Sequence, residues 1–229
     1  MKPVEMTYFS DVLCIWAFVS QARIEAVAQK YGDRVRVQHR FCSVFGDADR
    51  RLPTAWKDRG GYDGFNAHLK QIAQRFPHIA LHPDLWLTVR PPTSSSVHLF
   101  LKATEQSLID AADRDPQSSG RVFAQTLSAM RTAFFRDCRD IARWDVQCDV
   151  AEPLGIDLAA IERHVRSGRA FSLLAADYQD AAKMGIEGSP SIVLNEGRQK
   201  LYGNVGFHLI DANIEELLRS PGPNEASWC

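Results

Sequence analysis

Cys14 is the residue with the clearest chemical potential in this sequence, because of the segments that flank it. A short apolar strand is predicted over Val4–Phe9, and Ser10 and Asp11 suit a turn, since their short polar side chains bond nearby backbone N–H groups. A helix is predicted to begin at Cys14, which places the thiol among the unpaired N–H groups of a helix N-terminus. Because those groups and the helix dipole stabilise a thiolate, we expect a lowered pKa and a nucleophilic cysteine.

The alternative for Cys14 is simple packing, because free cysteine is among the most buried residue types. A strand, a turn and then Cys-x-Trp-x at a helix start is the placement of the thioredoxin-like redox motif. Ala17 stands where the second cysteine of Cys-x-x-Cys would be. The motif therefore predicts chemistry through one thiol, with any second thiol supplied from elsewhere.

A second cysteine, Cys42, is expected close to the first. Apolar and polar residues alternate from Val35 to Phe41, which predicts another strand. Strand, helix and strand of these lengths form a βαβ unit with parallel strands and a right-handed crossover. Cys42 would then lie at the same sheet edge as Cys14, about one strand spacing away if the strands are neighbours. It is a candidate resolving thiol, and the alternative is a buried cysteine that closes the strand.

The middle of the chain is predicted to be helical. Residues 45–62 are expected to form a loop because of Pro53, Gly60 and Gly61, and residues 65–168 carry helical spacing of apolar residues. The expected helical segments are Phe65–Phe76, one starting at Pro91-Pro92, Val122–Phe135, one capped by Asp145 that ends at Gly155, and one capped by Asp157 that ends near Gly168. Trp56 and Trp86 are expected either to help cover the Cys14 edge as a substrate pocket or to pack as core.

The C-terminal part is predicted to return to strands. A helix over Phe171–Met184 is followed by strands at Ser191–Leu194 and Gln199–Tyr202, joined by a hairpin turn, and by a helix over Asp211–Leu218. We expect a discontinuous domain at residues 1–45 and 169–219, a helical insertion domain at 46–168 and a flexible tail at 220–229.

Composition narrows the function classes. The 229 residues have a formal net charge of -1 and no basic block, which argues against a nucleic-acid or anionic-membrane partner. No apolar run approaches the roughly 20 residues of a membrane helix, and no signal-peptide core follows Met1. Five scattered cysteines do not suggest a disulfide framework, and no Cys/His spacing matches a metal site. We expect a cytoplasmic protein.

Three segments carry a resemblance to known proteins: Ser10–Ala17, Phe134–Ile141 and Met184–Val193. They resemble the DsbA/FrnE-like proteins of the thioredoxin superfamily, and the last segment is similar to that family's Gly-(Val/Ile)-x-Gly-x-Pro-(Thr/Ser) loop. The resemblance implies an α/β protein with a thioredoxin-like fold, βαβ followed by ββα, and a large all-helical insertion.

The resemblance also implies a binding site. It implies that Pro190 follows a cis peptide bond and faces Cys14, and that the backbone of Ser189 pairs with an extended thiol peptide such as glutathione. The residues expected to bind substrate or glutathione are Ser10, Trp16, Ser189, Pro190 and Asn204. Kappa-class glutathione transferases and 2-hydroxychromene-2-carboxylate isomerases share the scaffold, but usually carry serine at the Cys14 position and an acidic residue where Asn204 lies.

The leading hypothesis is a thiol–disulfide oxidoreductase that acts through Cys14, with release by glutathione or by Cys42. A glutathione transferase or isomerase is the second hypothesis, and a redox-inactive binding module is the third. The expected partners are a thiol or disulfide substrate and glutathione as co-substrate, with no tightly bound cofactor. A homodimer is an open alternative.

Overall fold

The computed structural model describes residues 3–111 and 116–219. The chain divides into two compact units, one formed by residues 1–42 and 179–229 and the other by residues 43–178. The second boundary falls inside helix α8 (Arg169–Lys183). The tail expected at 220–229 lies outside the described residues.

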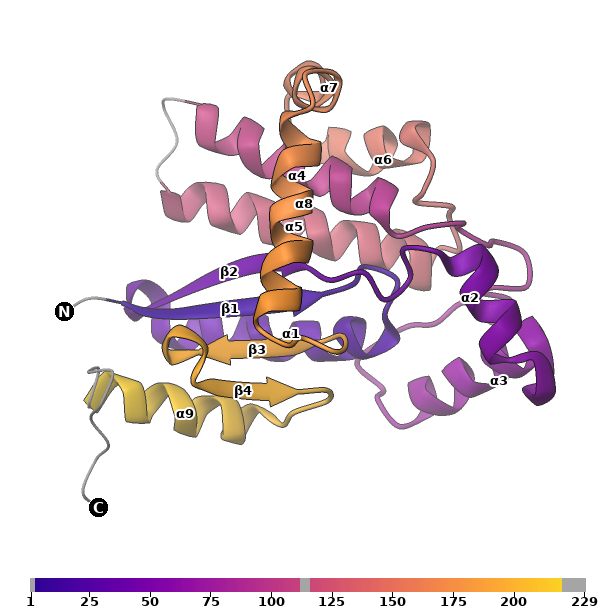
Figure 1. Cartoon of the computed structure of the whole chain (residues 1–229), viewed down its shortest axis with the longest axis horizontal. Coiled ribbons are helices and arrows are strands. Elements are labelled where there is room, and N and C mark those ends of the chain that lie inside the picture. Colours follow the sequence, from indigo (N-terminus) through magenta and orange to yellow (C-terminus); the bar gives the residue numbers. More distant parts are fainter. Residues whose placement is uncertain (1–2, 112–115, 220–229) are drawn as a thin grey trace. The chain divides into compact units, whose positions relative to one another are not determined.

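The first unit contains a four-stranded mixed sheet in the order β2-β1-β3-β4 (Figure 1). Strand β1 pairs in parallel with β2 and antiparallel with β3, and β3 pairs antiparallel with β4. This is the predicted thioredoxin-like fold. The elements of this unit are β1 (Val4–Ser10), α1 (Ile15–Tyr31), β2 (Val35–Phe41), β3 (Ser191–Leu194), β4 (Gln199–Tyr202) and α9 (Phe207–Arg219).

The core of this unit forms because the apolar patterns of its elements meet. Met6 and Tyr8 alternate along β1, and α9 buries Ile210 and Ile214, which are four residues apart on one helix face. Full burial of a side chain of this size stabilises the fold by roughly 1.5–3 kcal/mol. The central strands β1 and β3 are thereby fixed in register, with Phe9 opposite Ser191.

The second unit is built mainly of helices around an aromatic core. Trp86 is buried, with ring centroids 6.0 Å from Phe45, 5.7 Å from Phe65 and 5.4 Å from Phe134. Trp86 is thus a core residue of this unit, which was one of its two expected roles. The other role, lining a substrate pocket at the Cys14 edge of the sheet, stays a prediction. The helices are α2 (Ala48–Ala55), α3 (Gly61–Gln74), α4 (Ser95–Asp110), α5 (Pro116–Phe135), α6 (Trp144–Ala151), α7 (Leu158–Arg166) and part of α8.

The prediction of a loop at residues 45–62 is wrong, because helix α2 lies in this segment and contains Pro53. Ala48 and Leu52 are buried four residues apart, and the N–H groups of Ala48 and Asp49 both donate to the carbonyl of Pro92. Tertiary packing and these two bonds therefore outweigh the one helical bond that a proline removes.

Several helix ends also differ from the expectation. Helix α4 begins at Ser95, after Pro91-Pro92, because the Pro92 carbonyl is engaged by α2. Asp145 lies inside the first turn of α6, where it pairs with Arg143, and is not the cap.

The helix cap predicted at Asp157 is confirmed, because the Asp157 carboxylate accepts a hydrogen bond from Ala160 N at 3.0 Å. Helix α9 begins at Phe207, ahead of the expected Asp211.

Candidate active site

Cys14 is placed by a tight turn between β1 and α1. The carboxylate of Asp11 accepts a hydrogen bond from Leu13 N at 3.0 Å, and the carbonyl of Asp11 accepts one from Cys14 N at 3.1 Å. This is the local side-chain-to-backbone pairing that the Ser-Asp sequence predicts. Cys14 is the N-cap residue of α1 in an extended conformation, and its side chain makes no capping bond. Its thiol is therefore available to the loop that precedes β3.

The thiol of Cys14 donates to the carbonyl oxygen of Ser189 at 3.2 Å. The peptide bond between Ser189 and Pro190 is cis, the geometry implied by the family motif. The hydroxyl oxygen of Ser189 accepts from Asp11 N at 2.8 Å, which leaves its O–H free to donate. The structure thus brings together three residues predicted for the site: Cys14, Ser189 and Pro190.

The expected lowering of the Cys14 pKa is wrong. The side chain is only 6% exposed, and this burial raises the pKa of the thiol above its ordinary value because the thiolate loses its hydration. The Ser189 hydroxyl and the N–H groups of Trp16 and Ala17 lower the pKa, as a helix N-terminus should, but they are outweighed. The negative charge of Asp11 raises it further.

Cys42 lies against the same loop as Cys14. Its backbone N–H donates to Ser10 O at 3.3 Å, and its thiol lies 3.9 Å from the carbonyl of Gly188, a long sulfur contact. Both cysteines are buried, and neither forms a disulfide. The two thiols therefore contact the carbonyls of consecutive residues, Gly188 and Ser189.

The other predicted binding residues are placed differently. Ser10 is completely buried, and its carbonyl accepts from Cys42 N. Trp16 is partly buried in the first turn of α1. Asn204 is exposed, and its side-chain oxygen accepts from Arg23 Nη1 at 2.7 Å. Among these three, Asn204 is therefore already held by a charged partner from α1.

Tyr202 lies next to the site and is not among the predicted site residues, whereas Gly188 was noted only as part of the family loop motif. A Cβ built on Gly188 would lie 2.6 Å from the phenol oxygen of Tyr202, so the ring covers this glycine. Tyr202 pairs with Ser191 across the β3–β4 hairpin. The four residues that separate the two predicted strands could have given this register, because a hairpin pairs the first residue of one strand with the last of the other.

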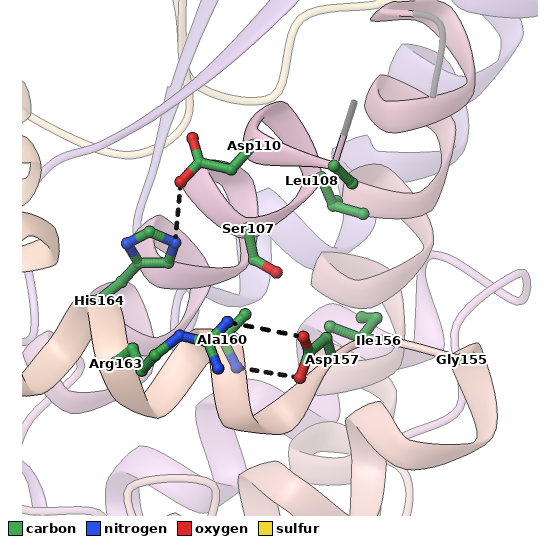
Figure 2. Close-up of a pocket in the computed structure, with 10 residues that line it drawn as sticks. Ser107, Leu108, Asp110, Gly155, Ile156, Asp157, Ala160, Arg163 and His164 are labelled. Carbon is green, nitrogen blue, oxygen red and sulfur yellow. Dashed lines mark hydrogen bonds and ion pairs between the residues drawn. The ribbon is translucent and has the colours of Figure 1, made fainter. Parts of the chain in front are cut away.

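A separate hollow of about 270 Å³ lies in the second unit, at the C-terminal end of α4 and the start of α7 (Figure 2). It is bordered by the contact of His164 Nε2 with Asp110 Oδ2 at 3.3 Å and by the ion pair of Arg163 with Asp157 at 3.8 Å. None of the residues predicted for the thiol site lines it. Within residues 3–111 and 116–219, no cluster of His, Cys, Asp and Glu could hold a metal ion.

A scan of known families matches residues 5–215 to the DSBA-like thioredoxin domain. The chain belongs to this family. The match includes both halves of the first unit, so that it covers the Cys14 turn and the Ser189–Pro190 loop. Over the residues that the structure describes, no helix has the length and apolar character needed to cross a membrane.

This DSBA-like chain is similar to proteins of several different functions. It is 26% identical to the ClpXP adapter protein SpxH of Halalkalibacterium halodurans, over 95% of this chain and 68% of the relative. The cytosolic disulfide reductase DsbM of Pseudomonas aeruginosa, solved with GSH, has a TM-score of 0.64 at 20% identity, over 94% and 99% of the two chains. A 2-hydroxychromene-2-carboxylate isomerase has a TM-score of 0.62 at 18% identity, over 95% and 97%.

Proposed function

We propose that this protein is a cytoplasmic thiol–disulfide oxidoreductase that acts through Cys14 and uses glutathione as its co-substrate. The observation that carries the proposal is the 3.2 Å contact between Cys14 Sγ and the carbonyl of Ser189, directly before cis-Pro190. Membership of the DSBA-like family supports the reaction class, and the GSH-containing structure of DsbM supports the co-substrate.

The reaction begins when the Cys14 thiolate attacks one sulfur of a substrate disulfide. A new S–S bond forms to Cys14, the old one breaks, and the leaving thiolate takes a proton from water. Glutathione then attacks the mixed disulfide, and a second glutathione completes the exchange. One substrate disulfide is reduced and two glutathione thiols become one oxidised glutathione.

Burial of Cys14 has two opposing effects on this chemistry. A raised pKa leaves a small thiolate fraction at neutral pH, but each thiolate is a stronger nucleophile. The O–H of Ser189 is placed to donate to that thiolate, because the hydroxyl oxygen already accepts from Asp11 N. Ser189 thus stabilises the attacking form of Cys14 while Asp11 orients Ser189.

Ser189 also offers a backbone group to the substrate. Its N–H makes no hydrogen bond to any other residue in the described part of the chain. An extended peptide can use this donor as in β-strand addition, which would place a cysteine of the peptide beside Cys14. Substrate binding and thiol positioning then depend on the same residue.

A single-thiol mechanism follows from Ala17, because the position of the usual second cysteine carries no thiol. Cys42 lies near enough to the same loop to be the alternative resolving thiol. If Cys42 performs this role, oxidation produces a Cys14–Cys42 disulfide; if glutathione does, it produces a glutathione adduct on Cys14 with Cys42 free.

The test measures glutathione-dependent reduction of a peptide disulfide by the wild type, Cys14→Ser and Cys42→Ser. We expect Cys14→Ser to lose the activity and Cys42→Ser to keep it, with mass spectrometry showing a glutathione adduct on Cys14. A chromogenic glutathione-conjugation assay runs in parallel. Conjugation without exchange would replace this proposal by the transferase class, and no activity in either assay would favour a binding module.

A further inference from the structure

The hollow in the second unit has the size and lining of a site for a small ligand (Figure 2). It lies where the last turn of α4 meets the start of α7, and its volume of about 270 Å³ is close to the lower limit of roughly 300 Å³ for pockets that bind small molecules. Its apolar lining comes from Leu108, Ile156 and Ala160, which are all buried. The hollow therefore offers a small apolar surface to a ligand.

One buried hydroxyl on the wall of this hollow lacks a hydrogen-bond partner. Ser107 is only 8% exposed, and within residues 3–111 and 116–219 its hydroxyl makes no hydrogen bond. The hydroxyl of Thr104 on the same helix, by contrast, donates to Phe100 O at 2.9 Å. Figure 2 shows the Ser107 side chain pointing toward the space between α4 and α7. Because a buried hydroxyl without a partner is unfavourable, a polar ligand that bonds Ser107 is stabilised in this hollow.

Opposite charges lie in pairs at the rim. Asp110 Oδ2 lies 3.3 Å from His164 Nε2, and Asp157 Oδ2 lies 3.8 Å from Arg163 Nη2. The side chains of Asp110, Asp157 and Arg163 are more than half exposed, and contacts between such exposed groups contribute little to stability. A ligand with charges of its own can therefore replace them.

The two helix ends give the rim a direction. Asp110 is the last residue of α4, where the final carbonyl groups and the negative end of the helix dipole favour a cation. Asp157 keeps its place without Arg163, because its Oδ1 accepts from Ala160 N at 3.0 Å. The Arg163 guanidinium can thus turn to an incoming anion while the cap of α7 stays intact.

We infer that this hollow binds a free α-amino acid with an apolar side chain. The ammonium group of the ligand pairs with Asp110, and its carboxylate pairs with Arg163 and accepts from the Ser107 hydroxyl. The aliphatic side chain of the ligand covers the apolar lining. A free amino acid fits because it carries both charges on one carbon atom within a small volume. The site is separate from the proposed disulfide exchange and does not depend on it.

The test measures binding of L-leucine to the whole protein by calorimetry and by the rise in thermal unfolding temperature. Leucinamide lacks the carboxylate and 4-methylpentanoate lacks the ammonium group. Each should bind at least about tenfold more weakly, because a hydrogen bond to a charged group contributes about this factor. Glycine lacks the apolar side chain and should also bind at least about tenfold more weakly.

Variants at the rim assign the binding to this hollow. Arg163→Gln and Ser107→Ala should each weaken L-leucine binding about tenfold. Arg166→Gln is the matched control and should bind like the wild type, because Arg166 lies on the same helix but pairs with Glu162 at 2.6 Å and does not line the hollow. Circular dichroism checks that each variant is folded. If Ser107→Ala is not, the exposed Arg163→Gln decides.

Absence of saturable L-leucine binding would overturn the inference, and so would equal binding of L-leucine and either of its two analogues. Binding that Arg163→Gln and Ser107→Ala leave unchanged would place the ligand elsewhere and reject this site. Cys14→Ser should bind L-leucine as the wild type does, and Arg163→Gln should keep the disulfide exchange activity. The amino-acid site and the proposed function therefore fail separately.

Discussion

The backbone N–H of Asp11 donates to the hydroxyl oxygen of Ser189 at 2.8 Å, across 178 positions of the sequence. This bond joins the turn before α1 to the loop before β3, and both ends are buried. The Ser189 O–H remains able to donate to the Cys14 sulfur, which lowers the pKa of the thiol. One hydroxyl therefore joins the two segments and also stabilises the Cys14 thiolate.

Ser189→Ala should therefore affect stability and chemistry together. The buried Asp11 N–H would lose its hydrogen-bond acceptor, which should lower the free energy of unfolding measured in urea by about 1–3 kcal/mol. The pKa of Cys14 should rise further, because the Ser189 hydroxyl bond lowers it, and alkylation by iodoacetamide at pH 7 should slow. Ser191→Ala is the matched control, because its hydroxyl bonds the carbonyl of Gly188 and should leave alkylation of Cys14 unchanged.

The thiol of Cys14 should titrate above the ordinary cysteine range of about 8.5. Burial raises its pKa, and the charge of Asp11 adds to this. Alkylation rates against pH, with Cys14→Ser as the blank, should show this midpoint, and Asp11→Asn should move it downward while keeping an acceptor for Leu13 N. A wild-type midpoint below that ordinary value would mean that stabilisation of the thiolate by the helix N-terminus outweighs the effect of burial.

The same raised pKa has a consequence for stability. Because the folded state holds the proton more tightly than the unfolded state, the contribution of Cys14 is complete below the ordinary cysteine pKa and is lost as pH rises through the folded value. The stability difference between the wild type and Cys14→Ser should therefore shrink in alkaline urea titrations. A difference that stays constant from pH 7 to beyond that midpoint would contradict the shift.

Ala17→Cys should restore a dithiol. Positions 14 and 17 are the N-cap and third residue of α1, where helical geometry gives Cα separations inside the roughly 4.4–6.8 Å that a disulfide spans. The variant, made in a Cys42→Ser background, should form a 14–17 disulfide and reduce insulin without glutathione. Peptide mapping that finds only glutathione adducts would show that the buried Ala17 position cannot direct its sulfur to Cys14.

Tyr31 should contribute to the stability of the fold without affecting the reactivity of Cys14. Its hydroxyl oxygen lies 2.7 Å from Asp211 Oδ1 and 2.8 Å from Glu215 Oε1, so its single O–H is shared between two carboxylates and joins the end of α1 to α9. Tyr31→Phe should lose about 1–2 kcal/mol in urea unfolding, the range for bonds to charged acceptors. Cys14 alkylation in this variant should equal that of the wild type. A change in alkylation as large as that in Ser189→Ala would indicate general loosening.

Asp211 should make the free energy of unfolding depend on pH in the acid range. The Lys30 ammonium and the Tyr31 hydroxyl lower the pKa of its carboxyl. Its contribution is therefore present above the ordinary value of about 3.9 and is lost as pH falls through the folded value. The difference in unfolding free energy between the wild type and Asp211→Asn should be visible at pH 7 and should close in strong acid.

The sequence was sufficient for features that depend on local patterns. Strands β1, β2, β3 and β4 were predicted because alternation and turn residues set them, and the DSBA-like motif at Gly188–Pro190 located the loop that faces Cys14. The helix α2 was missed because its decisive bonds go to Pro92, some 40 residues away. The pKa direction of Cys14 was missed because burial is a tertiary property, and the helix N-terminus that the sequence reveals is the weaker influence.

Cys14 and Ser189 are 175 positions apart in the sequence, so Cys14 is synthesised well before the residue that contacts its thiol. A ribosome that adds 5–20 residues per second needs roughly 10–35 s to proceed from one to the other. Throughout that interval the nascent chain carries Cys14 without the carbonyl and hydroxyl that later contact it. The cysteine is then open to cellular oxidants and to glutathione, so a newly made molecule could enter the folded state already carrying a mixed disulfide.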